Sequence, residues 1–269
     1  MRVIARSFAA YLRAAIATML QYRGEIVLWA IWGLINPAVL YAIWSAAAES
    51  NPDQTLAGFD RGQFAAYYLC IMIIGHFTTA WDAYELGYLI RSGQLSPQLL
   101  RPILPIWAAL AANMAYKVTT LVFVGPMWLL FFWIIRPTID AAAWQICLGI
   151  VATILAGLLN FLLGYAVALV SFWSPKLDAV GEAYFGVGMM FGGRFAPLAT
   201  FPPILSHIAY ILPFRWMYAF PAELMMGKVT TPTDALSGIA VQLVWLLAIV
   251  GVFRIGWRGA VKHYTAVSG

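Results

Sequence analysis

Long apolar segments separated by short polar ones dominate the chain. At about 1.5 Å per helical residue, roughly 20 apolar residues cross the hydrocarbon core of a bilayer. Six segments reach or approach that length: residues 26–47, 64–81, 106–135, 144–173, 181–200 and 236–253. The segment 181–200 is the weakest, because it contains Glu182, Arg194 and several glycines. The pattern predicts an all-α polytopic membrane protein with six transmembrane helices.

Two further apolar segments do not suit a simple crossing. In residues 1–22, Arg2, Arg6 and Arg13 fall on one side of a helix and apolar residues on another, which predicts an amphipathic helix lying in the membrane surface. Residues 201–230 hold apolar pieces that are too short to cross and that lie between prolines. They predict a re-entrant helical hairpin in the external leaflet before the last span, with an external loop packed over the bundle as the alternative.

Composition supports the membrane class. Hydrophobic residues make up 63% of the 269 positions and charged residues only 10%, whereas a soluble domain carries about 25% charged residues. The twelve Trp and thirteen Tyr suit the interfacial belts of a helical membrane protein. Cys70 and Cys147 lie inside apolar segments, which favours small core residues over a disulfide or a metal site. Gly149, Gly157 and Gly164 predict a close approach of another helix to 144–173.

Lysine and arginine are unevenly divided between the two sides, which predicts orientation. With a cytoplasmic N-terminus, ten of them are cytoplasmic (Arg2, Arg6, Arg13, Arg23, Arg91, Arg101, Lys176, Arg254, Arg258 and Lys262) and five external (Arg61, Arg136, Arg194, Arg215 and Lys228). We therefore expect both termini and the loop 86–105 in the cytoplasm, and the loop 49–63 outside. Lys117 lies within the segment 106–135 and is expected to snorkel toward the headgroups.

Residues 90–105, IRSGQLSPQLLRPILP, form a short polar segment that cannot lie in the hydrocarbon core of a bilayer. Arg91 and Arg101 would each cost roughly 2.5–3.5 kcal/mol at the bilayer centre, and the prolines interrupt a helix. Ser96 followed by Pro97 predicts an N-cap and the first residue of a very short helix. The adjacent Leu99 and Leu100 then suit docking into a cytoplasmic partner. A rigid turn with both leucines folded back on the membrane helices is the alternative.

Two motifs resemble a known family. They are I-R-S-G-x-L-x-x-x-L-L-R-P at 90–102 and L-P-F-R-W-x-Y-x-x-P-A-E-L-x-x-G-K at 212–228. Together with six spans and an amphipathic N-terminal helix, they are similar to the ABC-2 family of transporter permeases. Within it, the branch that includes viologen-exporter-type permease subunits of bacteria matches best. The resemblance covers essentially the whole chain, 1–269, as a single transmembrane domain.

The resemblance implies an exporter permease subunit in the bacterial cytoplasmic (inner) membrane. Its coupling loop, 86–105, would contact a separate ABC ATPase subunit that binds ATP and Mg²⁺. The coupling residues would be Gly93, Leu95, Leu99, Leu100, Arg101 and Pro102, and the external gate would comprise Pro213, Phe214, Arg215, Trp216, Pro221 and Glu223. A second copy or a paralogous permease would complete the pathway.

The chain itself contains no phosphate-binding loop, since its one Gly-Lys pair, Gly227-Lys228, is followed by Val229. No cofactor, nucleic acid or catalytic residue is expected. An intramembrane enzyme is the remote alternative, because the histidines, His76, His207 and His263, lie in no catalytic motif. We expect His76 to make a hydrogen-bonded helix–helix contact.

A stand-alone carrier or channel is the other alternative. It would use the polar residues at membrane depth, since such groups are paired or line a water-filled path. The candidates are Asn36, His76, Asp82, Glu85, Asn113, Lys117, Asn160, Glu182, Arg194 and Glu223. Against this alternative, no inverted repeat relates the two halves of the chain. Glu85 and Lys117 are expected to form a structural ion pair.

Overall fold

The fold was obtained as a computed structural model, which describes residues 2–21, 23–173 and 177–264. The described residues form helices and loops and no strand, which confirms the all-α prediction. The helices are α1 (Arg2–Gln21), α2 (Arg23–Glu49), α3 (Arg61–Thr78), α4 (Asp82–Arg91), α5 (Ser96–Leu99), α6 (Ile106–Ile135), α7 (Ala143–Ala168), α8 (Leu177–Phe191), α9 (Pro203–Ile211), α10 (Pro213–Met217), α11 (Ala219–Met225) and α12 (Pro232–Ala260). Short 3₁₀ turns are η1 (Leu169–Phe172), η2 (Leu198–Thr200) and η3 (Val261–His263).

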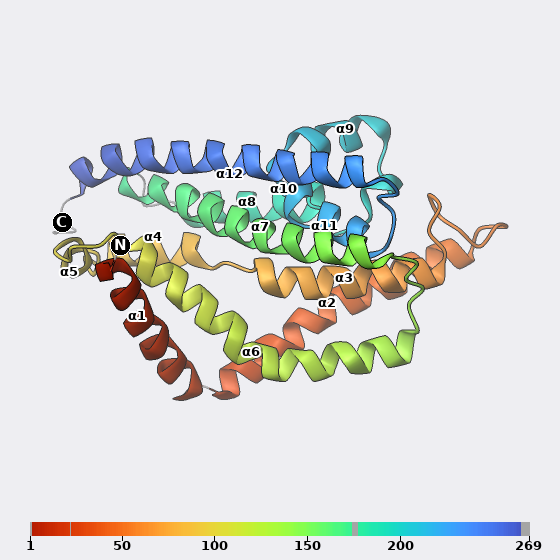
Figure 1. Cartoon of the computed structure of the whole chain (residues 1–269), viewed down its shortest axis with the longest axis horizontal. Helices are drawn as coiled ribbons and strands as arrows, with labels where there is room; N and C mark the ends of the chain where they lie inside the picture. Colours follow the sequence, from red (N-terminus) through yellow and green to blue (C-terminus); the bar gives the residue numbers. More distant parts are fainter. Residues whose placement is uncertain (1, 22, 174–176, 265–269) are drawn as a thin grey trace.

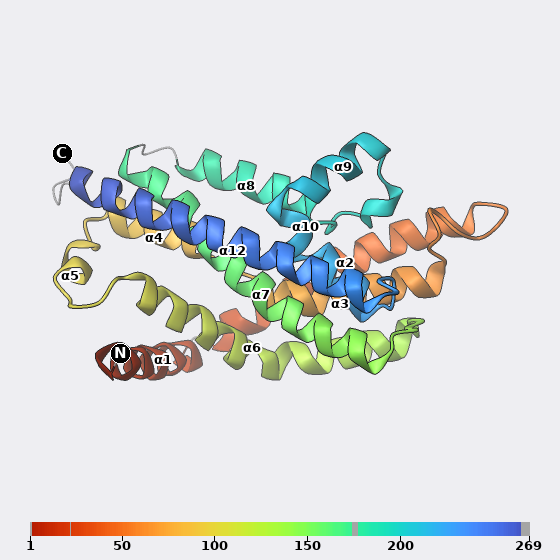
Figure 2. The same cartoon turned by 45° about the horizontal axis from the view of Figure 1, so that its top comes forward.

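The helices form an elongated bundle whose long helices share one general direction (Figure 1). Helix α12 packs along α7, α3 packs between α2 and α7, and α6 packs against α2 and α3. The start of α1, helix α5 and the end of α12 lie at one end, which we call the terminal end (Figures 1 and 2). The loop between α2 and α3 lies at the opposite end. Of the basic residues counted above, Lys176 lies outside the described residues.

In the part of the chain that the structure describes, five helical segments are long and apolar enough to cross a membrane. They are Val3–Gln21, Ile26–Glu49, Ile106–Ile135, Ala143–Phe172 and Pro232–His263. Helix α1, expected in the membrane surface, therefore also has the length and composition of a span. Helix α3 is absent from this set because its first turn, Arg61-Gly62-Gln63, is polar.

Helix α8 is shorter than the segment 181–200 predicts. It has 15 residues, or about 22 Å, against a hydrocarbon core of about 30 Å. It ends at Phe191, where Gly192 and Gly193 follow and Gly193 takes a left-handed φ of 78°. A side chain at Gly193 would meet the Tyr67 hydroxyl at 2.6 Å. Glycine therefore permits both the turn and its close contact with α3.

The expected second span, 64–81, is broken. Helix α3 ends at Thr78 and α4 begins at Asp82. The freed carbonyl oxygens find side-chain donors: Asn160 Nδ2 lies 2.7 Å from the Thr78 oxygen, and Asn113 Nδ2 and Lys117 Nζ each lie 3.1 Å from the Thr79 oxygen. Backbone that leaves a helix at membrane depth requires such partners.

The position of Lys117 corrects two predictions. Its ammonium bonds to the Thr79 carbonyl and to Asn113, within the bundle, so it does not snorkel to the headgroups. Among the described side chains, the expected ion pair between Glu85 and Lys117 does not form. The break between α3 and α4 offers Lys117 a backbone acceptor, which sequence reasoning did not include.

Small residues bring α7 close to its neighbours, as predicted. A Cβ atom at Gly157 would lie 2.8 Å from the Phe77 carbonyl oxygen, and one at Gly149 would lie 2.5 Å from the Met225 side chain. Gly164, in contrast, has nothing within 4 Å of that position. Two of the three glycines therefore confirm the predicted close approach, and they hold α7 against α3 and α11.

Helix α1 is amphipathic, with Ile4, Phe8 and Tyr11 partly buried and Arg6 and Arg13 exposed. It packs beside the first part of α6 and crosses the bundle obliquely (Figure 1). The predicted partition of charged and apolar residues is therefore confirmed for the described side chains, which do not include Arg2. The apolar face of α1 covers α6.

Candidate functional site

The loop that connects α4 to α6 is anchored in the core at the terminal end. Leu95 is fully buried and belongs to a cluster with Leu86 of α4, Tyr165 of α7 and Phe253 of α12. Its backbone N–H donates to the Leu89 carbonyl at 3.0 Å. One loop side chain thus belongs to a buried cluster that includes residues of three helices.

Tyr264, beyond η3, holds the turn before α5. Its hydroxyl donates to the Gly93 carbonyl at 3.2 Å and lies 2.8 Å from the Ser96 hydroxyl. The predicted N-cap role of Ser96 is wrong: Leu95 is the N-cap of α5, and Ser96 uses its side chain for Tyr264. Gly93 has a left-handed φ of 71°, which explains a glycine at this turn.

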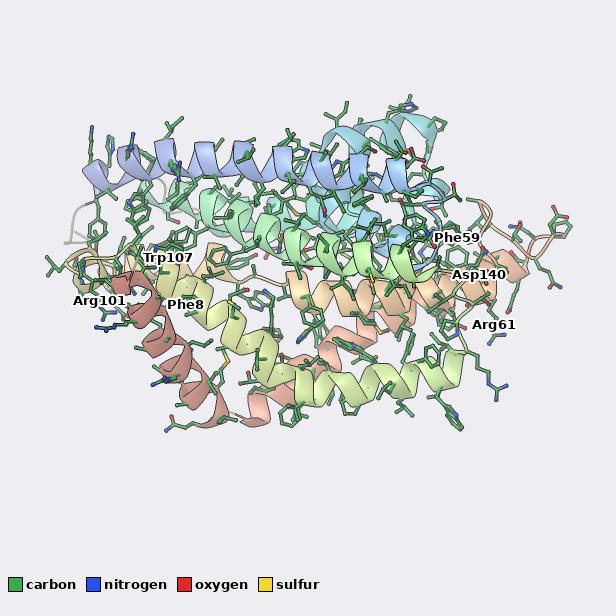
Figure 3. All side chains as sticks on the ribbon, in the orientation of Figure 1. Phe8, Phe59, Arg61, Arg101, Trp107 and Asp140 are labelled. Atoms are coloured by element: carbon green, nitrogen blue, oxygen red, sulfur yellow. The ribbon has the colours of Figure 1, made fainter. Side chains whose placement is uncertain are left out.

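The rest of the loop is exposed. The Leu100 side chain is 89% exposed, Arg101 and Pro102 are also exposed, and Leu99 is partly buried against the Leu95 cluster. Arg101 donates to the Tyr11 hydroxyl at 3.0 Å, so the loop is joined to α1. Figure 3 places Arg101, Phe8 and Trp107 together at this end.

The six predicted coupling residues thus have different surroundings. Gly93 and Leu95 shape and anchor the loop, Leu99 bridges to the core, and Leu100, Arg101 and Pro102 form the accessible tip. Of the two readings of the leucine pair, docking and folding back, the structure places Leu99 in the second arrangement and leaves Leu100 available for the first. Tyr11 and Tyr264, which support the tip, carry no local sequence signal and were missed.

The predicted gate residues lie inside the bundle. Helices α10 and α11 contact α3, α7 and α12, and nearly all their side chains are buried. Pro213, Trp216 and Pro221 belong to these buried pieces, whereas the preceding α9 is largely exposed. The segment 201–230 is therefore a set of short helices that turns back into the core.

A buried ion pair joins α10 to α11. Arg215 is 5% exposed, and its two terminal nitrogens donate to the two carboxylate oxygens of Glu223 at 2.9 and 2.8 Å. The guanidinium also stacks on Tyr210, 3.8 Å from the ring centroid. This bidentate geometry, which is typical of arginine, closes the turn between the two short helices.

Gln242 connects this turn to the long helices. It is 1% exposed and donates to the carbonyl oxygens of Trp216, at 2.7 Å, and Ala152, at 3.0 Å. Trp216 in turn donates from its indole nitrogen to the Tyr210 carbonyl at 3.1 Å. The segment around Trp216 is therefore held to α12 and, through Gln242, to α7 by buried hydrogen bonds.

A cavity of about 390 Å³ lies between α2, α3, α6, α7 and α8. Ten of its 28 described lining residues are Trp, Tyr or Phe, and they include Trp29, Trp81, Trp128 and Phe214, which was predicted to belong to the gate. Phe214 reaches the wall because Gly188 of α8 leaves room for its ring: a Cβ atom there would lie 3.2 Å from it. The predicted gate thus forms one side of the cavity.

Several of the polar residues flagged at membrane depth meet in this cavity. Asn36, His76, Asn160 and Arg194 line it. His76 Nε2 lies 3.1 Å from the Lys117 carbonyl oxygen, which confirms the predicted helix–helix contact and joins α3 to α6. The sequence indicates each of these residues separately but not their proximity, because they lie on different elements.

The opposite end of the bundle holds polar contacts of another kind. Lys228 donates to Gln63 at 3.1 Å and to the Gly58 carbonyl at 3.3 Å. Figure 3 shows Phe59, Arg61 and Asp140 at this end. Lys228 closes the second family-like motif, and here it joins the segment after α11 to the start of α3.

A family model described as "ABC-2 family transporter protein" matches residues 34–268, which is most of the chain. A search of curated proteins and a search of solved structures each gave no match. The matched region includes the anchored loop, the Arg215–Glu223 pair and most of the cavity lining. The all-α polytopic fold agrees with this assignment. The chain therefore belongs to the ABC-2 family of transporter proteins.

Proposed function

We propose that this chain is the permease subunit of an ATP-binding-cassette exporter in the bacterial inner membrane, with both termini in the cytoplasm. A separate ATPase subunit would bind ATP and Mg²⁺ and dock on the loop at the terminal end. The motifs at 90–102 and 212–228 favour the viologen-exporter-type branch of the family.

The observation that carries the proposal is the contrast between Leu100 and Leu95. Leu100 is 89% exposed at the tip of the loop, while Leu95, five positions earlier, is fully buried. An exposed leucine on a loop that is fixed in the core suits the transmission of motion. A partner that binds Leu100 and moves would also displace Leu95. A loop without that anchor would yield to the partner and transmit little.

The loop contacts the helical bundle through Leu95 and through Arg101. Leu95 contacts the cluster that contains Leu86, Tyr165 and Phe253, and these belong to α4, α7 and α12. Arg101 adds a contact with Tyr11 of α1. Closure of two ATPase subunits would therefore shift helices on both sides of the break at 79–81. Packed elements of this kind change position by rigid-body steps, which suits alternation between two states of a pathway.

A second permease, either another copy or a paralogue, would complete the translocation path. Helix α2 supports this part of the proposal, because Leu28, Trp32 and Val39 are 69%, 66% and 51% exposed along it. The cavity borders the same helix. Two subunits that met near α2 would bring their cavities to one shared pathway.

Co-purification tests the docking role. The Leu100→Asp variant places a charge at the exposed tip, and we expect it to lose the ATP-hydrolysing subunit that the unaltered permease retains in mild detergent. Gln54→Asp is the matched control, since Gln54 is exposed in the loop at the opposite end. If no ATPase accompanies the unaltered permease, the exporter proposal is wrong. If Leu100→Asp retains it fully, the docking surface is wrong.

A further inference from the structure

We propose that the cavity between α2, α3, α6, α7 and α8 binds a flat aromatic organic anion as the exported cargo. The inference rests on the proposed function, because it identifies the cargo class of the same permease. Two independent observations carry it: the aromatic residues of the cavity wall, and an arginine in the lining that has no carboxylate partner among the described residues.

The dimensions and walls suit a small aromatic molecule. Ligand sites commonly have volumes of roughly 300–1,000 Å³ and mostly apolar linings, and this cavity has about 390 Å³. Ring systems face it from several helices, among them Trp29 of α2, Trp128 of α6 and Phe185 of α8. Aromatic rings pair with one another in offset or edge-to-face contacts, so a flat ligand finds partners on more than one side.

Arg194 supplies the charge. Its backbone neighbours are held between α2 and α3: Tyr67 donates to the Gly193 carbonyl at 2.6 Å, and Trp44 and Tyr68 donate to the Phe195 carbonyl at 2.9 and 2.8 Å. These bonds keep Arg194 among the helices. An arginine held among apolar helices usually serves a site or a partner.

The contacts of Arg194 are aromatic. The guanidinium carbon lies 5.0 Å from the Tyr218 ring centroid and 5.4 Å from that of Phe185, and both rings line the cavity. Across the described residues, no carboxylate lies within ion-pair distance of Arg194. Cation–π contacts orient the guanidinium and leave its N–H groups without an anionic acceptor.

Arg215 shows what a structural arginine in this bundle looks like. It lies in the same half of the chain, it is buried, and both of its terminal nitrogens bond to Glu223. Arg194 has no such partner within the described part of the chain and lines an open cavity instead. The difference indicates that the counter-ion of Arg194 comes from outside the chain. A carboxylate, sulfonate or phosphate group on an aromatic ring would provide it.

The same arrangement disfavours organic cations, the charge class of viologens, so the cavity departs on this point from what the branch resemblance implies. Within the described part of the lining, no aspartate or glutamate offsets the charge of Arg194. A cation would gain from the aromatic faces but would be repelled by the guanidinium in a site with low dielectric constant. A neutral ring would gain the stacking contacts alone.

Binding of matched probes tests the inference. The full-length permease, in nanodiscs of neutral lipid without any ATPase, would be titrated calorimetrically with 2-naphthalenesulfonate, 2-naphthalenesulfonamide and a naphthyl-trimethylammonium salt. We expect the sulfonate to bind roughly tenfold or more tightly than the sulfonamide, a difference of about 1.4 kcal/mol or more. The cation should bind most weakly. Equal binding of all three, or tightest binding of the cation, would overturn the inference.

Two arginine variants locate the effect. Arg194→Gln should abolish the preference for the sulfonate while it leaves sulfonamide binding unchanged. Arg258→Gln removes one charge at an exposed site on α12 and should retain the preference. Equal losses in both variants would point to general electrostatic attraction and would contradict a site in the cavity.

Folding and function can be separated from this result. If Arg194→Gln does not yield a monodisperse protein, an azido-naphthalenesulfonate photoprobe on the unaltered permease replaces it. Labelling should fall on the peptides that contain Phe185 or Tyr218, and labelling elsewhere would refute the cavity. Because no ATPase is present in these assays, failure to bind refutes only the cargo class. Failure of co-purification refutes only the exporter proposal.

Discussion

The side-chain amide of Asn160 donates a hydrogen bond of 2.7 Å to the carbonyl oxygen of Thr78, the last residue of α3. The amide oxygen of Asn160 also accepts a hydrogen bond of 2.6 Å from the Tyr184 hydroxyl. One asparagine of α7 thus connects the broken end of α3 to α8. Both Asn160 and Tyr184 line the cavity, so the hydrogen bonds that stabilise the break after α3 also fix part of the cavity wall.

Replacement of Asn160 by leucine should destabilise the permease. The Thr78 carbonyl would lose its side-chain donor in a buried position, and an unsatisfied buried polar group costs about 1–3 kcal/mol. We expect a lower midpoint of thermal unfolding in detergent. Gln21→Leu is the control, because Gln21 is exposed at the end of α1, and its midpoint should stay close to that of the unaltered protein. Equal midpoints for the two variants would contradict a structural role for the amide.

Much of the fold follows from the length of the apolar segments. The predicted segments 26–47, 106–135 and 236–253 fall on α2, α6 and α12, because uninterrupted apolar residues have no other stable arrangement in lipid. The break after Thr78 was not predictable in this way. Threonine, alanine and tryptophan are all compatible with a helix, and the donor that satisfies the Thr78 carbonyl, Asn160, is 82 positions away.

The loop at α5 and the surroundings of Arg194 were predictable only where neighbouring residues in the sequence indicate the structure. A short helix near Ser96 follows from the Ser-Pro pair, and α5 begins there. The partner of Ser96, Tyr264, is 168 positions away and has no local signal. Arg194 was noticed as a charged residue within an apolar segment. Its aromatic neighbours, Phe185 of α8 and Tyr218 between α10 and α11, depend on how these elements pack, which the sequence pattern does not specify.

Removal of Arg215 should cost more than removal of an exposed arginine. Arg215→Met leaves Glu223 without its bidentate partner in a largely buried place, and loss of one member of a buried pair costs about 3–5 kcal/mol. The Arg61–Glu49 pair has side chains that are 67% and 48% exposed, so Arg61→Met should change stability by less than about 1 kcal/mol. Thermal unfolding in the same detergent compares the two variants.

The double variant Arg215→Met with Glu223→Leu separates charge from packing. It removes both charges and keeps side chains of similar volume, so it should recover most of the stability that Arg215→Met loses. If the double variant is as unstable as the single one, the pair contributes through its shape and its contact with Tyr210. The explanation by an unpaired carboxylate would then be wrong.

Two glycines of α7 provide a matched test of helix packing. Gly157→Ala would place a methyl group 2.8 Å from the Phe77 carbonyl oxygen, and a backbone atom cannot move aside cheaply. Gly164→Ala meets nothing within 4 Å and gains up to about 1 kcal/mol of helix propensity. We therefore expect the first variant to unfold at a lower temperature and the second at an equal or higher one. The reverse order would refute the close contact between α3 and α7.

Tyr264→Phe should loosen the loop that carries Leu100. The variant loses the hydrogen bonds to the Gly93 carbonyl and to Ser96, each worth about 1 kcal/mol, but retains the ring contact with Phe172. We expect faster amide hydrogen exchange in the peptide that spans 90–105, measured by mass spectrometry. Tyr88→Phe is the control, since Tyr88 is 56% exposed, and it should leave exchange unchanged.

The same variant tests whether anchoring matters for coupling. Leu100 remains exposed in Tyr264→Phe, so the ATPase subunit should still co-purify. Its motion would be transmitted less well, because the turn that connects the tip to the core has lost its fixed geometry. We expect less transport for each ATP hydrolysed by the reconstituted complex. Unchanged transport together with faster exchange would show that ATPase motion reaches the membrane helices without a rigid turn before α5. The packing of Leu95 in the core would then have to transmit that motion alone.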